Sequence, residues 1–110
     1  MTVEALHQRY DYGRLPPHLQ GGVRRYIEEG IPPGDFLTAV ITNNLRLAIG
    51  HADPTSLAAL TDIVRFFHNE SPSGCWGTPE KMKLWMETGY KKYLAFGAIK
   101  PYPVKIYKVK

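Results

Sequence analysis

Several features that carry function in other proteins are scarce in this chain of 110 residues. Cys75 is its one cysteine, so no disulfide can form within the chain. The four histidines are far apart and none stands in a His-x-x-x-His pair, so their spacing does not predict a metal site. No apolar run approaches the roughly 20 residues that a membrane-spanning helix needs. The first residues lack the basic and apolar regions of a signal peptide, and we expect a protein of the reducing cytoplasm.

Motifs for catalysis and cofactor binding are also missing. The chain has neither a glycine-rich loop ending in Gly-Lys-Ser/Thr nor a Gly-x-Gly-x-x-Gly motif. Cys75 stands beside Trp76 in a turn-rich loop, which favours a buried loop anchor over a catalytic thiol. Asp35, Asp53 and Glu80 each stand where a helix is expected to begin, which explains them without catalysis. We therefore expect no catalytic residue, no metal, no cofactor and no enzymatic activity.

Each side of Glu80 lacks one type of basic residue. All six arginines precede Glu80 and all eight lysines follow it, whereas eight of the ten acidic residues come before it. The C-terminal third is therefore strongly basic in a chain whose net charge is +4. Such a surface either faces a polyanion or only keeps the protein solvated, and the charge pattern leaves both interpretations open.

Apolar spacing and proline positions predict a mainly α fold, a small bundle of three main helices and a short fourth. Pro16-Pro17 opens the first helix, and Gly30 ends it. Residues 31–50 carry apolar side chains three and four positions apart, which predicts one central helix around which the others pack. Gly50 is expected to stop this helix in the left-handed conformation.

Two further helices have clear start signals. Asp53, as the N-cap before Pro54, begins a third helix that runs to about Asn69. Thr78-Pro79 begins the short fourth helix, which Gly89 ends. Apolar residues of the central and third helices are expected to form the core together: Leu37, Val40, Ile41, Leu45, Leu60, Ile63, Val64 and Phe67.

The last twenty residues change in character. Apolar residues there alternate imperfectly with lysines on either side of a proline-bearing turn, which predicts a C-terminal β-hairpin. The chain then divides into an N-terminal arm (1–15), a helical domain (16–89) and a lysine-rich hairpin or tail (90–110). An isolated hairpin is marginal in water and an exposed strand edge invites pairing. We therefore expect the hairpin to pack on the body or on another chain, and the protein to be a homo-oligomer.

Polar residues inside the central helix are the first candidate for a binding surface. Asn43 and Asn44 interrupt the apolar pattern, although asparagine is a poor helix former. A buried asparagine without a hydrogen bond costs roughly 1–3 kcal/mol. Two interpretations remain open: a structural hydrogen bond from Asn44 to the loop of residues 71–77, or a polar patch that faces a ligand.

Three segments resemble a group of small phage and prophage proteins of unknown function. They are GIPPGDFLTAV at residues 30–40, residues 44–48 with Ala52-Asp53, and SPSGCWG at residues 71–77. The resemblance covers roughly residues 16–88, and the lysine-rich tail departs from it. It implies an accessory protein that acts in the cytoplasm of an infected bacterium by binding rather than by catalysis. The targets it implies are a host defence protein, a nucleotide signal or nucleic acid.

The resulting hypothesis is a phage protein that counters host defence, most concretely a sponge that sequesters a nucleotide second messenger. Such a ligand needs arginine for its phosphates and an aromatic surface for its base. The predicted ligand-binding residues are Arg24, Arg25 and Arg46 for phosphate, Tyr26 and Trp76 for stacking, and Asn43 and Asn44 for base edges. A simpler interpretation has Arg24 and Arg25 pair with Glu28 and Glu29 at helical spacing, while Trp76 fills the core beneath its loop.

The alternative hypothesis is a nucleic-acid-binding accessory protein. The lysines of the tail would make contacts with phosphates that depend on salt and do not read sequence. The residues predicted to carry this function are Lys91, Lys92, Lys105 and Lys108.

Overall fold

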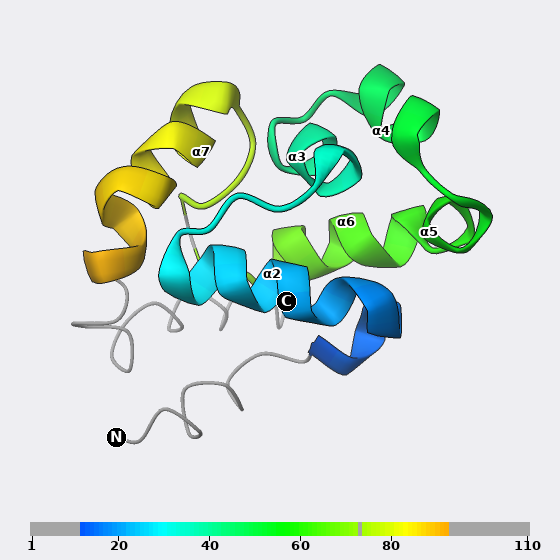
Figure 1. The fold of residues 1–110 in the computed structure, drawn as a ribbon, viewed down its shortest axis with the longest axis horizontal. Coiled ribbons are helices and arrows are strands. Elements are labelled where there is room, and N and C mark those ends of the chain that lie inside the picture. Colours follow the sequence, from blue (N-terminus) through cyan, green and yellow to red (C-terminus); the bar gives the residue numbers. More distant parts are fainter. Residues whose placement is uncertain (1–11, 73, 93–110) are drawn as a thin grey trace.

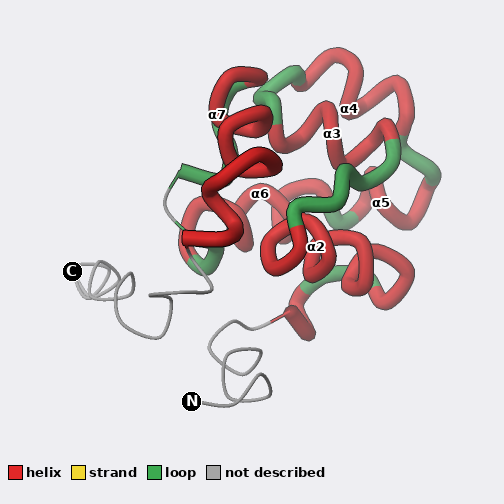
Figure 2. Tube along the Cα trace, turned by 60° about the vertical axis from the view of Figure 1, so that its left-hand side comes forward, coloured by secondary structure: helices red, strands yellow, loops and turns green. Residues whose placement is uncertain are grey.

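The computed structural model describes residues 12–72 and 74–92, and every regular element in them is helical. The elements are the 3₁₀ turn η1 (Tyr12–Arg14), α2 (Pro17–Glu29), α3 (Asp35–Ile41), α4 (Leu45–His51), α5 (Pro54–Ala58), α6 (Leu60–Asn69), α7 (Pro79–Leu84) and the π-helical turn η2 (Trp85–Gly89). Figure 2 shows helices joined by short loops. In Figure 1, α2 and α6 cross the middle, α3 and α4 lie on one side, and α7 lies toward one end.

The predicted C-terminal β-hairpin is wrong for the part of the chain that the structure describes. Residues 12–72 and 74–92 contain no strand, and residues 90–92, where the hairpin was expected to start, continue the helix beyond η2. The rest of the expected hairpin, residues 93–110, and most of the expected N-terminal arm, residues 1–11, lie outside the described residues. Tyr12 and Leu15 at the end of that arm are buried in the core, so they belong to the helical domain.

Three predicted helix starts are confirmed, and each has a physical cause. Pro17 occupies the first turn of α2, where its missing N–H leaves no hydrogen bond unmade. Asp53 accepts a hydrogen bond from the backbone N–H of Ser56 at 2.6 Å and caps α5. Thr78 caps α7 by accepting from the N–H of Lys81 at 3.0 Å. Gly30 ends α2 as predicted, in the left-handed conformation with φ of 70°.

The predicted central helix over residues 31–50 is wrong, because the chain breaks between α3 and α4. Thr42 is the C-cap of α3, and its hydroxyl donates to the carbonyl of Thr38 at 2.8 Å. Asn43 takes a left-handed conformation with φ of 64°, which asparagine tolerates better than most residues. Asn44 then caps α4 by accepting from the N–H of Leu47 at 3.1 Å. Gly50 is not a stop, since it lies inside α4.

The third and fourth helices also differ from the prediction. The third divides at Ala59 into α5 and α6. The fourth does not end at Gly89, because the chain remains helical to Lys92. The indole N–H of Trp85 donates to the carbonyls of Tyr26 and Ile27 at 3.1 and 3.2 Å, and this fastens the helix to the C-terminal end of α2. The carbonyl of Tyr26 also accepts from the backbone N–H of Gly30, whereas carbonyls in the last turn of a helix, such as that of Ile27, generally lack a partner within the helix.

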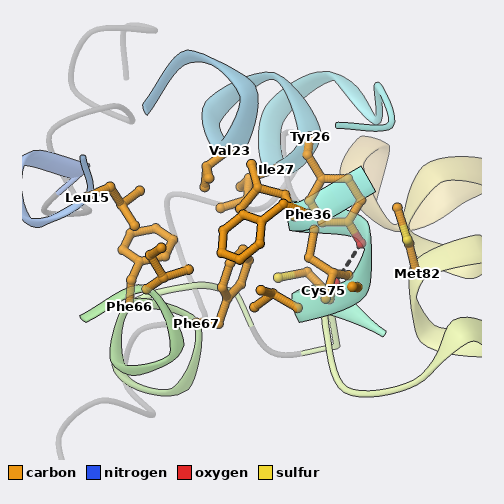
Figure 3. Packing of buried hydrophobic residues seen from close by; sticks show 14 of the residues in the cluster. Leu15, Val23, Tyr26, Ile27, Phe36, Phe66, Phe67, Cys75 and Met82 are labelled. Carbon is orange, nitrogen blue, oxygen red and sulfur yellow. Dashed lines mark hydrogen bonds between the residues drawn. The ribbon is translucent and has the colours of Figure 1, made fainter. Parts of the chain in front are cut away.

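The core is built mainly from α2, α3 and α6, and Val23 and Ile27 of α2 face Phe66 and Phe67 of α6 (Figure 3). Five of the eight predicted core residues are buried: Leu37, Val40, Ile41, Ile63 and Phe67. The prediction is wrong for the other three, since Leu60 is partly buried while Leu45 and Val64 are 62% and 36% exposed. The break before α4 removes Leu45 from the apolar stripe of α3.

Candidate functional site

Tyr26, predicted to stack on a base, has no accessible ring face. Its side chain is 0% exposed, and its hydroxyl donates to the carbonyl of Cys75 at 2.6 Å (Figure 3). Burial raises the pKa of Tyr26, so the phenol stays protonated and keeps this hydrogen bond. Tyr26 therefore ties α2 to the loop before α7 and does not belong to a ligand site.

Arg24 and Arg25 lie on α2 and have different surroundings. The guanidinium of Arg24 is 4.8 Å from the ring centre of Tyr12, a distance typical of a cation–π contact. Tyr12 in turn donates a hydrogen bond to the buried carboxylate of Glu28 at 3.1 Å. Arg25 is exposed. Of the two arginines, Arg25 is therefore the more accessible to a phosphate.

The other predicted ligand residues come together where α3 turns into α4. Asn43, Asn44 and Arg46 are consecutive or nearly so, and all three are exposed. The N–H of Gly77 donates to the carbonyl of Ile41 at 2.7 Å, which brings the loop of Trp76 to the same turn. We call Asn43, Asn44, Arg46 and Trp76 the polar corner.

Two side chains of the polar corner also have structural roles. Trp76 is half-buried, with its ring centre 5.8 Å from that of Phe67, as expected for a residue that covers the core. Of the two interpretations left open for Asn44, the structural one named the wrong partner, because its side-chain oxygen accepts from the N–H of Leu47 and caps α4. The contact between loop and helix end is the one between Gly77 and Ile41. Arg46 is the one charged residue of the polar corner.

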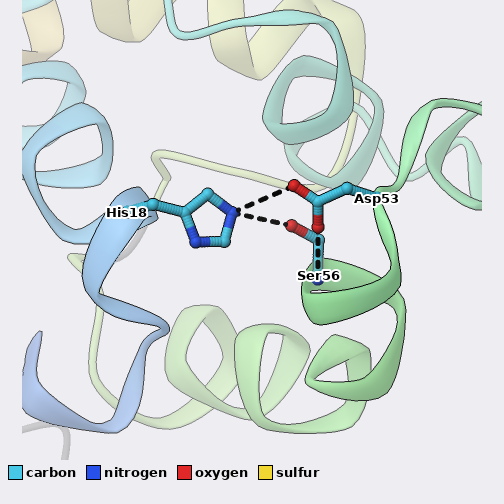
Figure 4. A network of polar contacts seen from close by, with 3 residues as sticks. All are labelled: His18, Asp53 and Ser56. Atoms are coloured by element: carbon cyan, nitrogen blue, oxygen red, sulfur yellow. Dashed lines mark hydrogen bonds and ion pairs between the residues drawn. The ribbon is translucent and has the colours of Figure 1, made fainter.

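The structure also assembles a histidine, an aspartate and a serine that the sequence did not single out together (Figure 4). His18 Nε2 lies 3.1 Å from Ser56 Oγ and 3.3 Å from Asp53 Oδ2. In a hydrolase triad the serine and the carboxylate bind opposite nitrogens of the imidazole, whereas here both contact the same nitrogen. Ser56 is also 2% exposed. The arrangement therefore links the start of α2 to the start of α5 and does not activate a nucleophile.

Only part of this cluster had a signal in the sequence. The capping pattern at Asp53-Pro54 predicts that Asp53 accepts from a backbone N–H in the first turn, and the structure confirms it. His18 is far from Asp53 in the chain, and no spacing rule pairs them. The hydrogen bonds to Ser56 lower the pKa of Asp53, and the nearby imidazole contributes in the same direction.

Cys75 is confirmed as a buried loop anchor. Its side chain is 0% exposed, and burial raises the pKa of the thiol to about 12. A thiol in this state is neither a nucleophile nor a metal ligand at neutral pH. Within residues 12–72 and 74–92, no three His, Cys, Asp or Glu side chains lie close enough to hold a metal ion. No helix of this described part is long and apolar enough to cross a bilayer.

The lysines of the alternative hypothesis fall partly within the described residues. Lys91 and Lys92 are exposed at the end of the last helix, and Lys91 Nζ is 5.9 Å from the ring centre of Tyr90. Lys83, Glu87 and Lys91 are four residues apart, so acidic and basic positions alternate along one side of this helix. Lys105 and Lys108 lie outside the described residues.

An exposed apolar surface on α4 was not predicted. Leu45, Leu47 and Ile49 are 62%, 49% and 48% exposed, and Ala48 is the one buried residue of this helix. At 100° per residue, Leu45, Arg46 and Ile49 share one side of α4, and Leu47 lies on the other side of Ala48. We call Leu45, Arg46 and Ile49 the α4 flank. Apolar side chains gathered on one exposed element are typical of an interaction surface.

Comparison with known proteins adds no family to these observations. No protein-family model, curated protein or solved structure matches the chain. The resemblance to small phage proteins therefore stays an expectation from the sequence segments. The polar corner and the α4 flank are defined by geometry alone.

Proposed function

We propose that the protein is a phage accessory protein that acts in the host cytoplasm by binding, and that the polar corner is its ligand surface. The most concrete ligand is an anionic nucleotide second messenger, which the protein would sequester from a host defence system. The observation that carries this proposal is the exposed Arg46 beside Asn43, at the turn to which the loop of Trp76 is bonded. A planar guanidinium matches phosphate oxygens, and asparagine can pair with base edges.

The two side chains best suited to act as nucleophiles, Cys75 and Ser56, support a function in binding rather than in catalysis. Cys75 is a buried thiol, and Ser56 shares a single imidazole nitrogen with Asp53. Both side chains are buried, at 0% and 2% exposed, so a substrate cannot reach either of them in this fold. Arg46 and Asn43, in contrast, are exposed and can bind a ligand without a change in the fold.

Calorimetry with cyclic dinucleotides, cyclic trinucleotides and cyclic ADP-ribose isomers tests this proposal. We expect binding of at least one of them, and a loss of about tenfold or more in affinity for Arg46→Ala, because a charge-assisted hydrogen bond contributes about 1.5–3 kcal/mol. The matched control is Arg65→Ala, an exposed arginine on α6. Arg25→Ala tests whether α2 contributes. No heat from the whole panel, or equal losses for Arg46→Ala and Arg65→Ala, would reject the polar corner as the site.

A nucleic-acid-binding function is the second candidate, and the exposure of Lys91 and Lys92 favours it. Phosphate contacts release counterions, so affinity should fall steeply between two salt concentrations. Gel shifts with duplex and single-stranded probes, comparing the protein with Lys91→Ala/Lys92→Ala, provide the test. The same mobility of every probe with and without protein at low salt would exclude this function.

A further inference from the structure

Lys81 of α7 reaches back to the loop that carries Trp76. Its Cδ and Nζ atoms lie 3.6 and 3.7 Å from the point where a Cβ atom on Gly77 would stand. Gly77 has no side chain and a φ of 123°, a conformation that favours glycine. The stem of Lys81 therefore lies close to the backbone of Gly77, although Lys81 as a whole is exposed to solvent.

The position of Gly77 brings Lys81 to the turn between α3 and α4. The N–H of Gly77 donates to the carbonyl of Ile41 at 2.7 Å, and Asn43 comes directly after Thr42 in this turn. Lys81 Nζ is at most about 9 Å from the Ile41 carbonyl oxygen, since only the backbone of Gly77 and one hydrogen bond separate them. In Figure 1 the connection from α3 to α4 runs between the start of α7 and α4.

We propose that Lys81 is a further phosphate-binding residue beside the polar corner, and that the ligand carries at least two phosphate groups. This inference rests on the proposed function and adds a second cation to Arg46. Arg46 follows the turn on α4, whereas Lys81 approaches the turn from α7. Within residues 12–72 and 74–92, no ion pair joins either cation to a carboxylate. Two unpaired cations on different elements suit separate phosphates, as in a cyclic dinucleotide.

A purely structural role for Lys81 makes a different prediction. The carbonyl end of α3 carries partial negative charge, which a nearby ammonium group would stabilise. Two of its carbonyls already have partners, since Thr38 accepts from the hydroxyl of Thr42 and Ile41 accepts from the N–H of Gly77. We therefore expect Lys81→Gln to lower the affinity for anions and to leave the melting temperature nearly unchanged.

Titration with inorganic tripolyphosphate, followed by the backbone amide signals in NMR spectra, tests the inference without a nucleotide. The amides of Asn43, Asn44 and Gly77 should shift, and tripolyphosphate should bind more tightly than inorganic phosphate because the longer anion can contact both cations at once. Lys81→Gln should lower the tripolyphosphate affinity about fivefold. The loss should be smaller than for Arg46→Ala, because an ammonium group is a point charge whereas a guanidinium binds two oxygens. Lys81→Arg should retain the affinity.

Lys83→Gln is the matched control, because Lys83 is also exposed on α7 but lies about 200° around the helix from Lys81. Unshifted amides at Asn43 and Gly77, equal losses in Lys81→Gln and Lys83→Gln, or a lower melting temperature with unchanged affinity in Lys81→Gln would overturn the inference. Tripolyphosphate binding that depends on Lys81, without binding of any nucleotide, would reject the proposed function and leave the anion site standing. Nucleotide binding that Lys81→Gln leaves unchanged would reject the role of Lys81 alone.

Discussion

α6 and α4 are both short helices with several large apolar side chains, yet they meet solvent differently. α6 buries Ile63, Phe66 and Phe67, whereas α4 buries only Ala48. The spacing of the apolar residues explains the contrast. In α6 they are three and four positions apart and converge on one side, while in α4 Leu45, Leu47 and Ile49 alternate and fall on both sides of the helix.

α6 stabilises the fold, whereas the exposed side of α4 is free to bind. Phe67 is packed edge-on against Phe66 at 5.4 Å between ring centres, and its ring centre is 5.8 Å from that of Trp76. The α4 flank has no such cover within the described residues. Substitutions should therefore change stability in α6 and ligand binding at α4.

The largest expected effect is the loss of stability in Phe67→Ala. Phe67 is 1% exposed, so its truncation leaves a cavity in the centre of the core and should cost about 3–5 kcal/mol of unfolding free energy. Leu45→Ala removes a side chain that is 62% exposed and should cost less than about 1 kcal/mol. Urea denaturation followed by circular dichroism measures both. Similar losses in the two variants would show that α4 carries as much of the fold as α6 does.

The elements with strong local signals could be predicted from the sequence. Proline at a helix start fixes φ and an acidic or hydroxyl cap satisfies a free N–H, so Pro17, Asp53-Pro54 and Thr78-Pro79 each mark a helix start that the structure confirms. The break at Asn43 could not be predicted as easily, since no proline or glycine marks it. Thr42 ends α3, Asn43 takes the left-handed conformation and Asn44 caps α4. When the apolar stripe is assumed to continue, the same three residues look like polar positions within one helix.

The candidate site was predicted only in part, because exposure depends on packing between distant residues. The buried Tyr26 and the exposed Arg25 are neighbours on one helix, and the sequence assigned both to a ligand. What separates them is the contact of Tyr26 with Cys75, 49 residues away. The contact between His18 and Asp53 likewise joins residues that are far apart in the sequence. Local spacing predicts which side chains share a helix face, but not which face the rest of the chain covers.

A medium effect is expected at the junction of α2 with the last helix. Gly30 has φ of 70°, and a Cβ atom there would lie 2.5 Å from the ring of Tyr90. Gly30→Ala should therefore destabilise the protein by about 1–3 kcal/mol, from backbone strain and displacement of Tyr90. Gly34→Ala is the control, because nothing lies within 4 Å of its added Cβ, and it should change stability by less than about 0.5 kcal/mol. Thermal denaturation of the two variants would contradict this view if their midpoints agreed.

The smallest expected effect is the pH dependence that Asp53 contributes at the base of α5, just beyond α4. Hydrogen bonds from Ser56, and then the imidazole of His18, lower the pKa of Asp53 from its ordinary value of 3.8. A carboxyl with a lowered folded-state pKa contributes stability above pH 3.8, and this contribution is lost as the pH falls through the lower, folded-state value. Asp53→Asn keeps a side chain that caps helices well but removes the charge.

The difference in melting temperature between the parent and Asp53→Asn isolates this contribution from the other carboxyl groups. We expect the parent to be more stable at pH 6 and the difference to shrink as the pH falls below 3.8, because the carboxylate becomes protonated there in the folded protein as well. When both proteins also carry His18→Ala, the difference at pH 6 should be smaller, because this substitution removes the imidazole but leaves the hydrogen bonds from Ser56. A difference that stays constant with pH, or widens in acid, would mean that Asp53 stabilises α5 through the shape of its cap and not through its charge.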